Sequence, residues 1–156
     1  MKPSAAQYAA ILARIEFVRS ELGVLAEYRD LGWPEYQRDR KARRNVERIA
    51  ENVANATIDV AKILLATTPF PVPATYREVL ETTVPAGLAD EASATELVRL
   101  AQLRNTLSHR YLDYKWDGIK WFLRTGAIFV AEWLRACERV LQPPVAGAPS
   151  LEQPTS

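Results

Sequence analysis

Apolar side chains recur at steps of three and four residues along most of the chain, a pattern typical of helices with one buried face. The first stripe comprises Tyr8, Ile11, Leu12, Ile15, Val18, Leu22 and Leu25. It predicts a helix over about residues 4–29. Gly32 and Pro34 follow it, and they are the residue types at which helices end.

Three further helices and a short one are predicted from the same periodicity. The second runs from residue 34 or 35 to 66, and Pro69, Pro71 and Pro73 then force an extended connection. A short helix is predicted over 75–82. Ser93 or Thr95 can cap the next helix, which continues to Leu107, and a last helix covers roughly 115–141.

Four long helices and a short one, joined by short or medium connections, predict an all-α fold, an antiparallel four-helix-type bundle with a short additional helix. We expect one domain over residues 1–141. After it the composition turns to Pro, Gly, Ala and Ser with hardly any charge, so residues 142–156 are predicted to be a disordered, proline-rich tail.

The composition narrows the functional classes. The chain has 156 residues, with Cys137 its one cysteine and His109 its one histidine. A disulfide framework and a zinc site are therefore excluded, whereas metals with oxygen ligands stay open. No apolar run approaches the ~20 residues of a membrane span, and Arg14 and Glu16 interrupt the only run that resembles a signal peptide. The pattern predicts a cytoplasmic protein without a membrane partner.

Positive charge is concentrated in one segment although the net charge is only +1. The segment from 38 to 48 contains Arg38, Arg40, Lys41, Arg43, Arg44 and Arg48 against Asp39 and Glu47. These cations lie early in a predicted helix, where the helix dipole disfavours positive charge. One interpretation is a surface that binds RNA or an acidic partner; the other is an ordinary solvated helix face.

The segment that carries chemistry is Arg104-Asn105-Thr106-Leu107-Ser108-His109-Arg110-Tyr111. Arg104 continues the apolar stripe of its helix, so its guanidinium must be paired, line a cleft or extend to solvent. His109 is the one side chain here whose ordinary pKa suits proton transfer near neutral pH. Considered alone, it could equally be a cap or a surface residue.

The spacing within the segment limits what can converge. Arg104 and His109 are five positions apart, about 140° on a straight helix, so they do not share one face. Asn105 can share a face with His109, and Arg104 with Ser108 and Tyr111. Arg104 and His109 converge only if the helix ends near Ser108 or if a second subunit completes a groove.

The motif Arg104-Asn105-x-Leu107-x-His109-x-Tyr111 resembles the R-x4-H-x-Y signature of the HepT toxins, within the wider HEPN superfamily. The resemblance covers roughly residues 8–140. Its other elements fall in the expected order: the turn at Trp33-Pro34-Glu35-Tyr36, the long second helix with Asp59, the Thr75-Tyr76 segment and the final amphipathic helix.

The resemblance implies metal-independent RNA cleavage by a homodimer, with no cofactor and with the motif lining a cleft between protomers. His109 would act as general base or acid, and Arg104 would stabilise the charge that develops on the phosphate. Asn105 and Ser108 would support the site. Arg110 would join Arg38, Lys41, Arg44 and Arg48 as possible contacts to RNA or a partner.

In the family, the tyrosine of the signature receives AMP from a separate minimal nucleotidyltransferase antitoxin, which silences the toxin. Tyr111 matches that position. Two alternatives remain. The chain could be a HEPN module without nuclease activity that binds nucleotides or a partner protein, or a scaffold bundle whose motif is coincidental.

Overall fold

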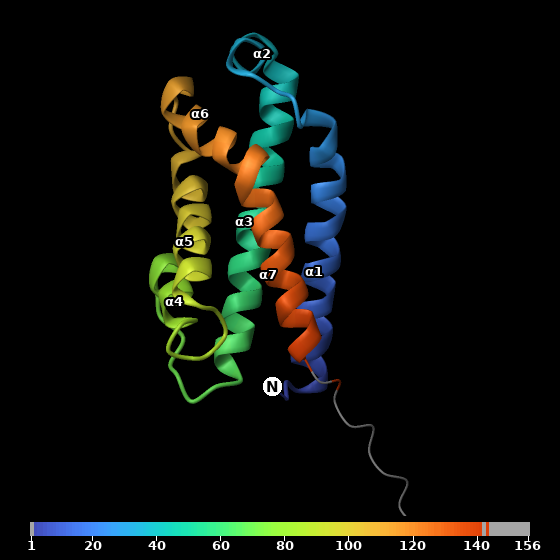
Figure 1. The fold of residues 1–156 in the computed structure, drawn as a ribbon, viewed down its shortest axis with the longest axis vertical. Helices are drawn as coiled ribbons and strands as arrows, with labels where there is room; N and C mark the ends of the chain where they lie inside the picture. The colour runs from blue at the N-terminus through green and yellow to red at the C-terminus, as the bar shows by residue number, and fades with distance from the viewer. Residues whose placement is uncertain (1, 142, 144–156) are drawn as a thin grey trace, which may run out of the picture.

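The chain folds into four long helical segments that run alternately in opposite directions (Figure 1). The computed structural model describes residues 2–141 and 143. The segments are α1 (Ala5–Leu25), α3 (Arg40–Ala66), α5 (Glu91–Thr106), and α6 (Leu112–Trp121) continuing into α7 (Ala127–Val140). The described residues contain no strand, so the predicted all-α antiparallel bundle is confirmed.

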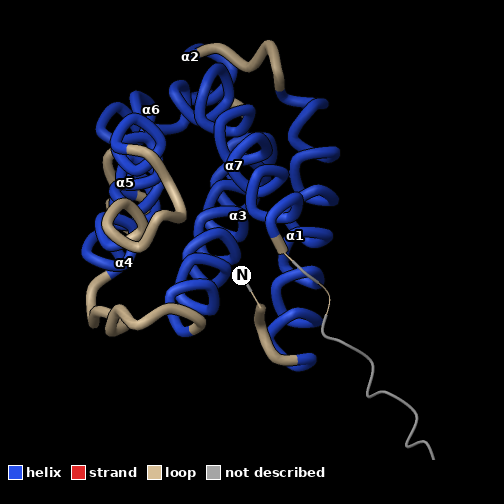
Figure 2. Tube along the Cα trace, turned by 60° about the horizontal axis from the view of Figure 1, so that its bottom comes forward, coloured by secondary structure: helices blue, strands red, loops and turns tan. Residues whose placement is uncertain are grey.

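The core lies between the four segments. α1 packs along α3, and α7 lies against both α1 and α5 (Figure 2). The stripe predicted for the first helix is buried at Ile11, Ile15, Val18 and Leu25. Fully buried residues of the other long helices include Ile58, Leu64, Leu97, Leu100 and Ile119. The short helix α4 (Tyr76–Thr82) covers α3 and α5 at the other end from α6, and Thr75 caps it.

The second predicted helix, from residue 34 or 35 to 66, is wrong in one respect: it is two helices, α2 (Trp33–Arg38) and α3. The break is at Asp39, whose backbone is extended and whose carboxylate accepts a hydrogen bond from the Ala42 amide. Arg43 donates to the Tyr36 and Gln37 carbonyls at the end of α2. The segment contains no glycine or proline at the break, so periodicity alone did not reveal it.

The helix that carries the motif begins earlier than predicted. Asp90, not Ser93 or Thr95, is its N-cap, and the Asp90 carboxylate accepts from the Ser93 amide at 2.6 Å. Hydrogen bonds from Ser93 lower the pKa of Asp90. The helix ends at Thr106, and Leu107 and Ser108 form a turn.

The last predicted helix begins at Leu112 rather than Lys115 and contains a π-helical turn at Phe122–Gly126. A Cβ at Gly126 would lie 2.8 Å from the Trp121 ring, so glycine permits the close packing there. Trp121, Phe122 and Trp133 are buried in the core. Trp116 is half-buried against Tyr36, and Phe129 is half-buried.

Two predictions about the chain as a whole have different outcomes. The predicted tail, 142–156, lies outside the described residues apart from Pro143, so the domain boundary stays a prediction. Within the described part of the chain, no helix combines the length and the apolar character needed to cross a membrane.

Candidate functional site

The motif lies where α5 ends and the chain turns into α6. Arg104 and Asn105 are in the last turn of α5, His109 and Arg110 are in the connecting loop, and Tyr111 is the N-cap residue of α6. The His109 amide donates to the Thr106 carbonyl at 3.0 Å, and the Ser108 hydroxyl donates to the Asn105 carbonyl at 3.0 Å. These local bonds fix the loop that presents His109.

Arg104 is half-buried and is paired, which decides among the interpretations left open by the sequence. Its Nε donates to Oδ1 of Asn55 on α3 at 2.9 Å, and its guanidinium carbon lies 4.9 Å from the centre of the Tyr76 ring. Nε is the only atom of the Arg104 side chain that donates a hydrogen bond to another described residue. Nη1 and Nη2 therefore keep their donors for a ligand.

His109 is exposed and lines a hollow of about 450 Å³ together with Tyr111, Asp113 and Tyr114. Its imidazole centre lies 4.9 Å from that of the Tyr114 ring, with 61° between the ring planes. Tyr111 is 76% exposed. The histidine and the signature tyrosine are thus both accessible to a ligand, and the two other residues of the motif loop, Ser108 and Arg110, are exposed as well.

The structure does not bring Arg104 and His109 into contact within one protomer. Arg104 contacts α3 and α4, whereas His109 contacts α6, and no hydrogen bond between described residues joins the two. Because α5 ends at Thr106, the two residues do not lie on one continuous helix. The angular separation predicted for a straight helix therefore does not apply to them. Asn105 is exposed and lines a separate hollow of about 500 Å³ with Tyr76, Arg77 and Gln102.

A row of polar residues on α3 contacts the neighbouring helices, and one member contacts the motif arginine. Each member contacts another helix: Asn52 donates to Glu21, Asn55 accepts from Arg104, Asp59 pairs with Arg14 at 3.4 Å, and the Lys62 ammonium lies 4.7 Å from the Tyr76 ring centre. Tyr76 is thus contacted by two cations, Lys62 and Arg104. The row is therefore a set of contacts between helices rather than a plain solvent face.

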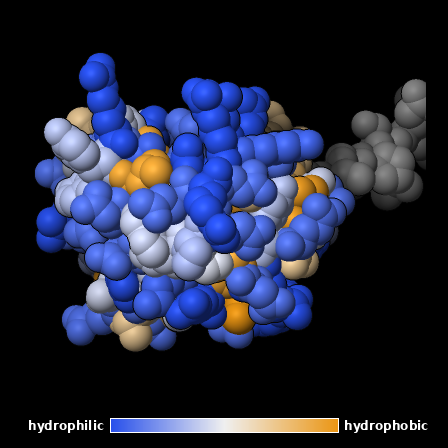
Figure 3. Space-filling view, turned by 90° about the horizontal axis from the view of Figure 1, so that it is seen from above, coloured by the Kyte–Doolittle hydropathy of each residue, from blue (hydrophilic) through white to orange (hydrophobic). Residues whose placement is uncertain are grey.

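The basic segment, residues 38–48, lies at the end of the bundle that contains α2, the start of α3 and α6 (Figure 1). Arg38, Lys41, Arg44 and Arg48 are all exposed. Arg38 Nε donates to the Pro34 carbonyl at 3.3 Å, and Arg43 donates to the Tyr36 and Gln37 carbonyls. Viewed from this end, the surface is mostly hydrophilic, with small, separate apolar patches (Figure 3). Arg38 lies in the last turn of α2, where the helix dipole favours a cation.

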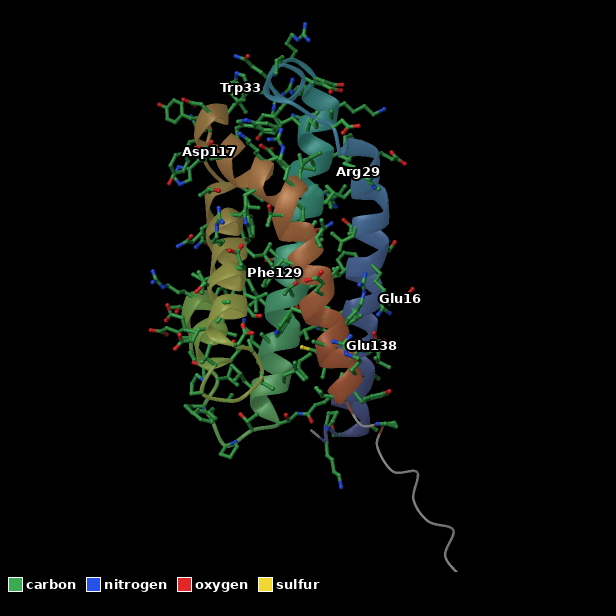
Figure 4. The ribbon with its side chains drawn as sticks, in the orientation of Figure 1. Glu16, Arg29, Trp33, Asp117, Phe129 and Glu138 are labelled. Carbon is green, nitrogen blue, oxygen red and sulfur yellow. The ribbon has the colours of Figure 1, made fainter. Side chains whose placement is uncertain are left out.

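A buried polar network that the sequence did not reveal fixes α6 to α2 and α3. The Lys115 ammonium lies 3.3 Å from Glu47 Oε1, and the Tyr36 hydroxyl donates to the same oxygen at 2.6 Å. Burial and the bond to Glu47 raise the pKa of Tyr36. Trp33 and Trp116 pack on Tyr36; Figure 4 shows Trp33 and Asp117 at this end of the molecule. The network sets the position of the helix that Tyr111 caps.

Two further observations concern the rest of the described chain. A hollow of about 660 Å³ lies between α1 and α7 and is lined by residues such as Leu25, Leu123 and Ile128, with none of the motif residues. Within the described residues, no group of three or more His, Cys, Asp or Glu side chains is placed to hold a metal ion.

The chain is similar to known proteins in sequence and in fold. The family model described as "Ribonuclease HepT-like" matches residues 18–126. No curated protein matches the chain.

Three solved structures share the fold. A toxin–antitoxin structure with AMP-PNP is 14% identical, with a TM-score of 0.73 over 83% of this chain and 96% of that one. The tri-AMPylated HEPN toxin of Shewanella oneidensis, in complex with its MNT antitoxin, is 15% identical, with a TM-score of 0.75 over 83% and 97%. YutE of Bacillus subtilis, a cytosolic protein of unknown function, is 16% identical, with a TM-score of 0.66 over 89% and 95%.

Proposed function

Because the chain belongs to the HepT-like ribonuclease family, we propose that it is a metal-independent endoribonuclease and the toxin of a toxin–antitoxin pair. The observation that carries the proposal is the exposed His109 in its hollow, just beyond the end of α5. Arg104 lies at that helix end, and its Nη groups form no hydrogen bond with another described residue. A proton-transfer group and a phosphate-binding fork are the two functions that RNA cleavage requires.

The chemistry follows from these two side chains. The 2′-oxygen of a ribose forms a bond to the adjacent phosphorus, and the bond from phosphorus to the 5′-oxygen of the next nucleotide breaks. His109 takes the proton from the 2′-hydroxyl or supplies the proton to the leaving 5′-oxygen. Arg104 donates to the phosphate oxygens, where negative charge concentrates in the transition state. Asn105 and Ser108 support the loop that carries His109 and contact the backbone of the substrate.

A homodimer would complete the site. Arg104 and His109 contact different helices within one protomer, and a two-fold axis beside the motif would place a second copy of each in the same cleft. One histidine could then act as base and the other as acid. The cations Arg38, Lys41, Arg44, Arg48 and Arg110 would hold the flanking RNA backbone or the partner.

Tyr111 would be the point of control by a cognate minimal nucleotidyltransferase. Its phenolic oxygen would form a bond to the α-phosphorus of ATP with release of pyrophosphate, and the phenolic proton would pass to a base on the partner. The exposure of Tyr111, 76%, and its place in the His109 hollow support this role. The attached AMP would put bulk and negative charge where the RNA phosphate must lie.

The test is cleavage of total cellular RNA with EDTA present by the wild-type protein and by His109→Ala, both shown by mass to be unmodified at Tyr111. We expect cleavage by the wild type and its loss in the variant, by about a hundredfold or more, as for removal of a general base. Arg139→Ala, at an exposed site at the far end of α7, serves as the control that passes through the same purification. Absence of cleavage by unmodified wild-type protein would overturn the proposal in favour of a HEPN module that only binds nucleotides or a partner.

A further inference from the structure

Tyr114 is an exposed aromatic residue whose position the bundle does not explain. It lies on α6, one turn after Tyr111, and is 57% exposed. Its hydroxyl takes part in none of the hydrogen bonds between described residues. A tyrosine exposed at a pocket rim offers both an apolar ring face and a hydroxyl to a ligand.

The surroundings of Tyr114 show what it faces. Its ring lies 4.9 Å from the imidazole of His109, and the 61° between the planes means that the rings do not cover each other as stacked rings would. Tyr114 also lines a second hollow, of about 210 Å³, between α5 and α6, with Arg99, Gln102 and Asp117. Tyr114 therefore lines both the His109 hollow and a neighbouring hollow between α5 and α6.

Asp113 places a carboxylate in the His109 hollow. It is exposed in the first turn of α6 and lines this hollow with Tyr114, so a phosphate is disfavoured beside Tyr114. A strand that presents its phosphate to His109 would thus turn a base, not a second phosphate, toward Tyr114.

We propose that Tyr114 is a stacking platform for an unpaired nucleobase next to the phosphate on which His109 acts. The Tyr114 and His109 ring centres are 4.9 Å apart, so a nucleotide whose phosphate lies at His109 has its base beside Tyr114. Stacking on an aromatic side chain needs a base that is free of its complement and tolerates all four bases. The inference rests on the proposed ribonuclease function and adds to it a selection for single-stranded RNA.

The experiment is a double-mutant cycle with an abasic substrate. The cleavage site is mapped first on wild-type protein, and a short single-stranded RNA is made with a 2′-deoxyribose at that site so that it binds without being cleaved. Matched versions lack one base, on the 5′ or the 3′ side of the phosphate. Affinity is measured for the wild type, Tyr114→Ala, Tyr114→Trp and the control Phe70→Ala, a 37% exposed aromatic residue in the loop after α3.

We expect Tyr114→Ala to weaken binding of the intact RNA by about fivefold to a hundredfold, which corresponds to one stacked base. The same variant should leave binding of one abasic RNA unchanged, because the stack is already absent. Tyr114→Trp should retain affinity, and Phe70→Ala should match the wild type. Circular dichroism checks that each variant is folded.

Two results would overturn the inference, and they are separable. Equal losses of affinity for intact and abasic RNA would mean that Tyr114 only positions His109 or the loop, while the nuclease function stands. A wild-type protein that neither cleaves nor binds RNA would remove the proposed function itself, and the platform with it.

Discussion

Asn55 and Asn52 lie one turn apart on α3, yet only Asn55 accepts a hydrogen bond from the motif arginine. We predict that Asn55→Ala lowers kcat for RNA cleavage by roughly tenfold, because a bond to a charged group is worth about 1.5–3 kcal/mol and its removal frees the guanidinium to rotate. Asn55→Asp should lower kcat further, since a carboxylate would compete with the phosphate for Arg104. Steady-state kinetics on a mapped oligonucleotide measures both.

The matched control is Asn52→Ala, which removes a bond to Glu21 on α1 and leaves Arg104 untouched. If Asn52→Ala and Asn55→Ala reduce kcat equally, the polar row acts through the packing of α1 on α3, and Asn55 has no special relation to the site.

Thr57 and Thr83 are both completely buried, but only one hydroxyl has a partner. Thr83 donates to the Leu80 carbonyl, whereas Thr57 Oγ1 is buried without a hydrogen bond among the described residues. A buried hydroxyl without a partner costs about 1–3 kcal/mol. We therefore predict that Thr57→Val raises the free energy of unfolding or leaves it unchanged, and that Thr83→Val lowers it. Urea denaturation of both variants checks the signs, and a clear loss of stability in Thr57→Val would contradict the assignment.

The residues of the candidate site were predicted from their types and their spacing in the sequence. Arg104, His109 and Tyr111 stand at a recognisable spacing, and the structure places them at one helix end. Tyr114 was not identified, because the last helix was predicted to begin only at about residue 115 and the exposure of a side chain cannot be read from the sequence. The Lys115–Glu47 pair joins residues from distant parts of the chain, and no local pattern predicts which two charges a fold will bury together.

At the scale of the helix, Asp90 holds the start of α5, which ends in the motif. Its pKa is lowered by the hydrogen bonds from Ser93, so the charged form is stabilised in the folded state. That stability is present above the ordinary pKa of 3.8 and is lost as the pH falls through the depressed value. We predict that Asp90→Ala lowers Tm at pH 7 and that the difference from the wild type shrinks below pH ~3.

Glu91→Gln is the control for this effect, because it removes a charge from the same turn and leaves the cap in place. Its Tm difference from the wild type should be smaller than that of Asp90→Ala at pH 7. Thermal denaturation across about pH 2.5–7 measures these Tm differences. A Tm difference between Asp90→Ala and the wild type that does not change with pH would contradict a contribution from the carboxylate charge.

The helices themselves were predictable because burial imposes a period on the sequence. Their ends were less so. The break at Asp39 depends on a hydrogen bond from the Ala42 amide to the Asp39 carboxylate and on two from Arg43 to carbonyls of α2. Aspartate can cap a helix, but its residue type alone does not show that it does so inside a segment predicted as one helix. Asp90 was passed over for Ser93 and Thr95 because all three residue types can cap a helix. Only the packing of the preceding loop decides which one does.

At the scale of the whole molecule, cations lie toward both ends of the bundle although the net charge is only +1. Arg38, Lys41 and Arg44 lie at the same end of the bundle as α6 and the His109 loop, while Arg135 and Arg139 lie on α7, which runs to the opposite end. If the basic end holds the backbone of RNA, cations at the two ends must contribute differently to binding.

We predict that Lys41→Gln/Arg44→Gln reduces the slope of log K against log salt concentration for single-stranded RNA by about 1.4, or about 0.7 for each phosphate that the protein no longer neutralises. Arg135→Gln/Arg139→Gln removes the same charge and should leave the slope nearly unchanged. Affinities measured over a range of salt for both double variants compare the ends directly. Equal slopes in the two variants would mean that RNA responds to the total charge of the molecule, and the cations of α3 would then be an ordinary solvated helix face.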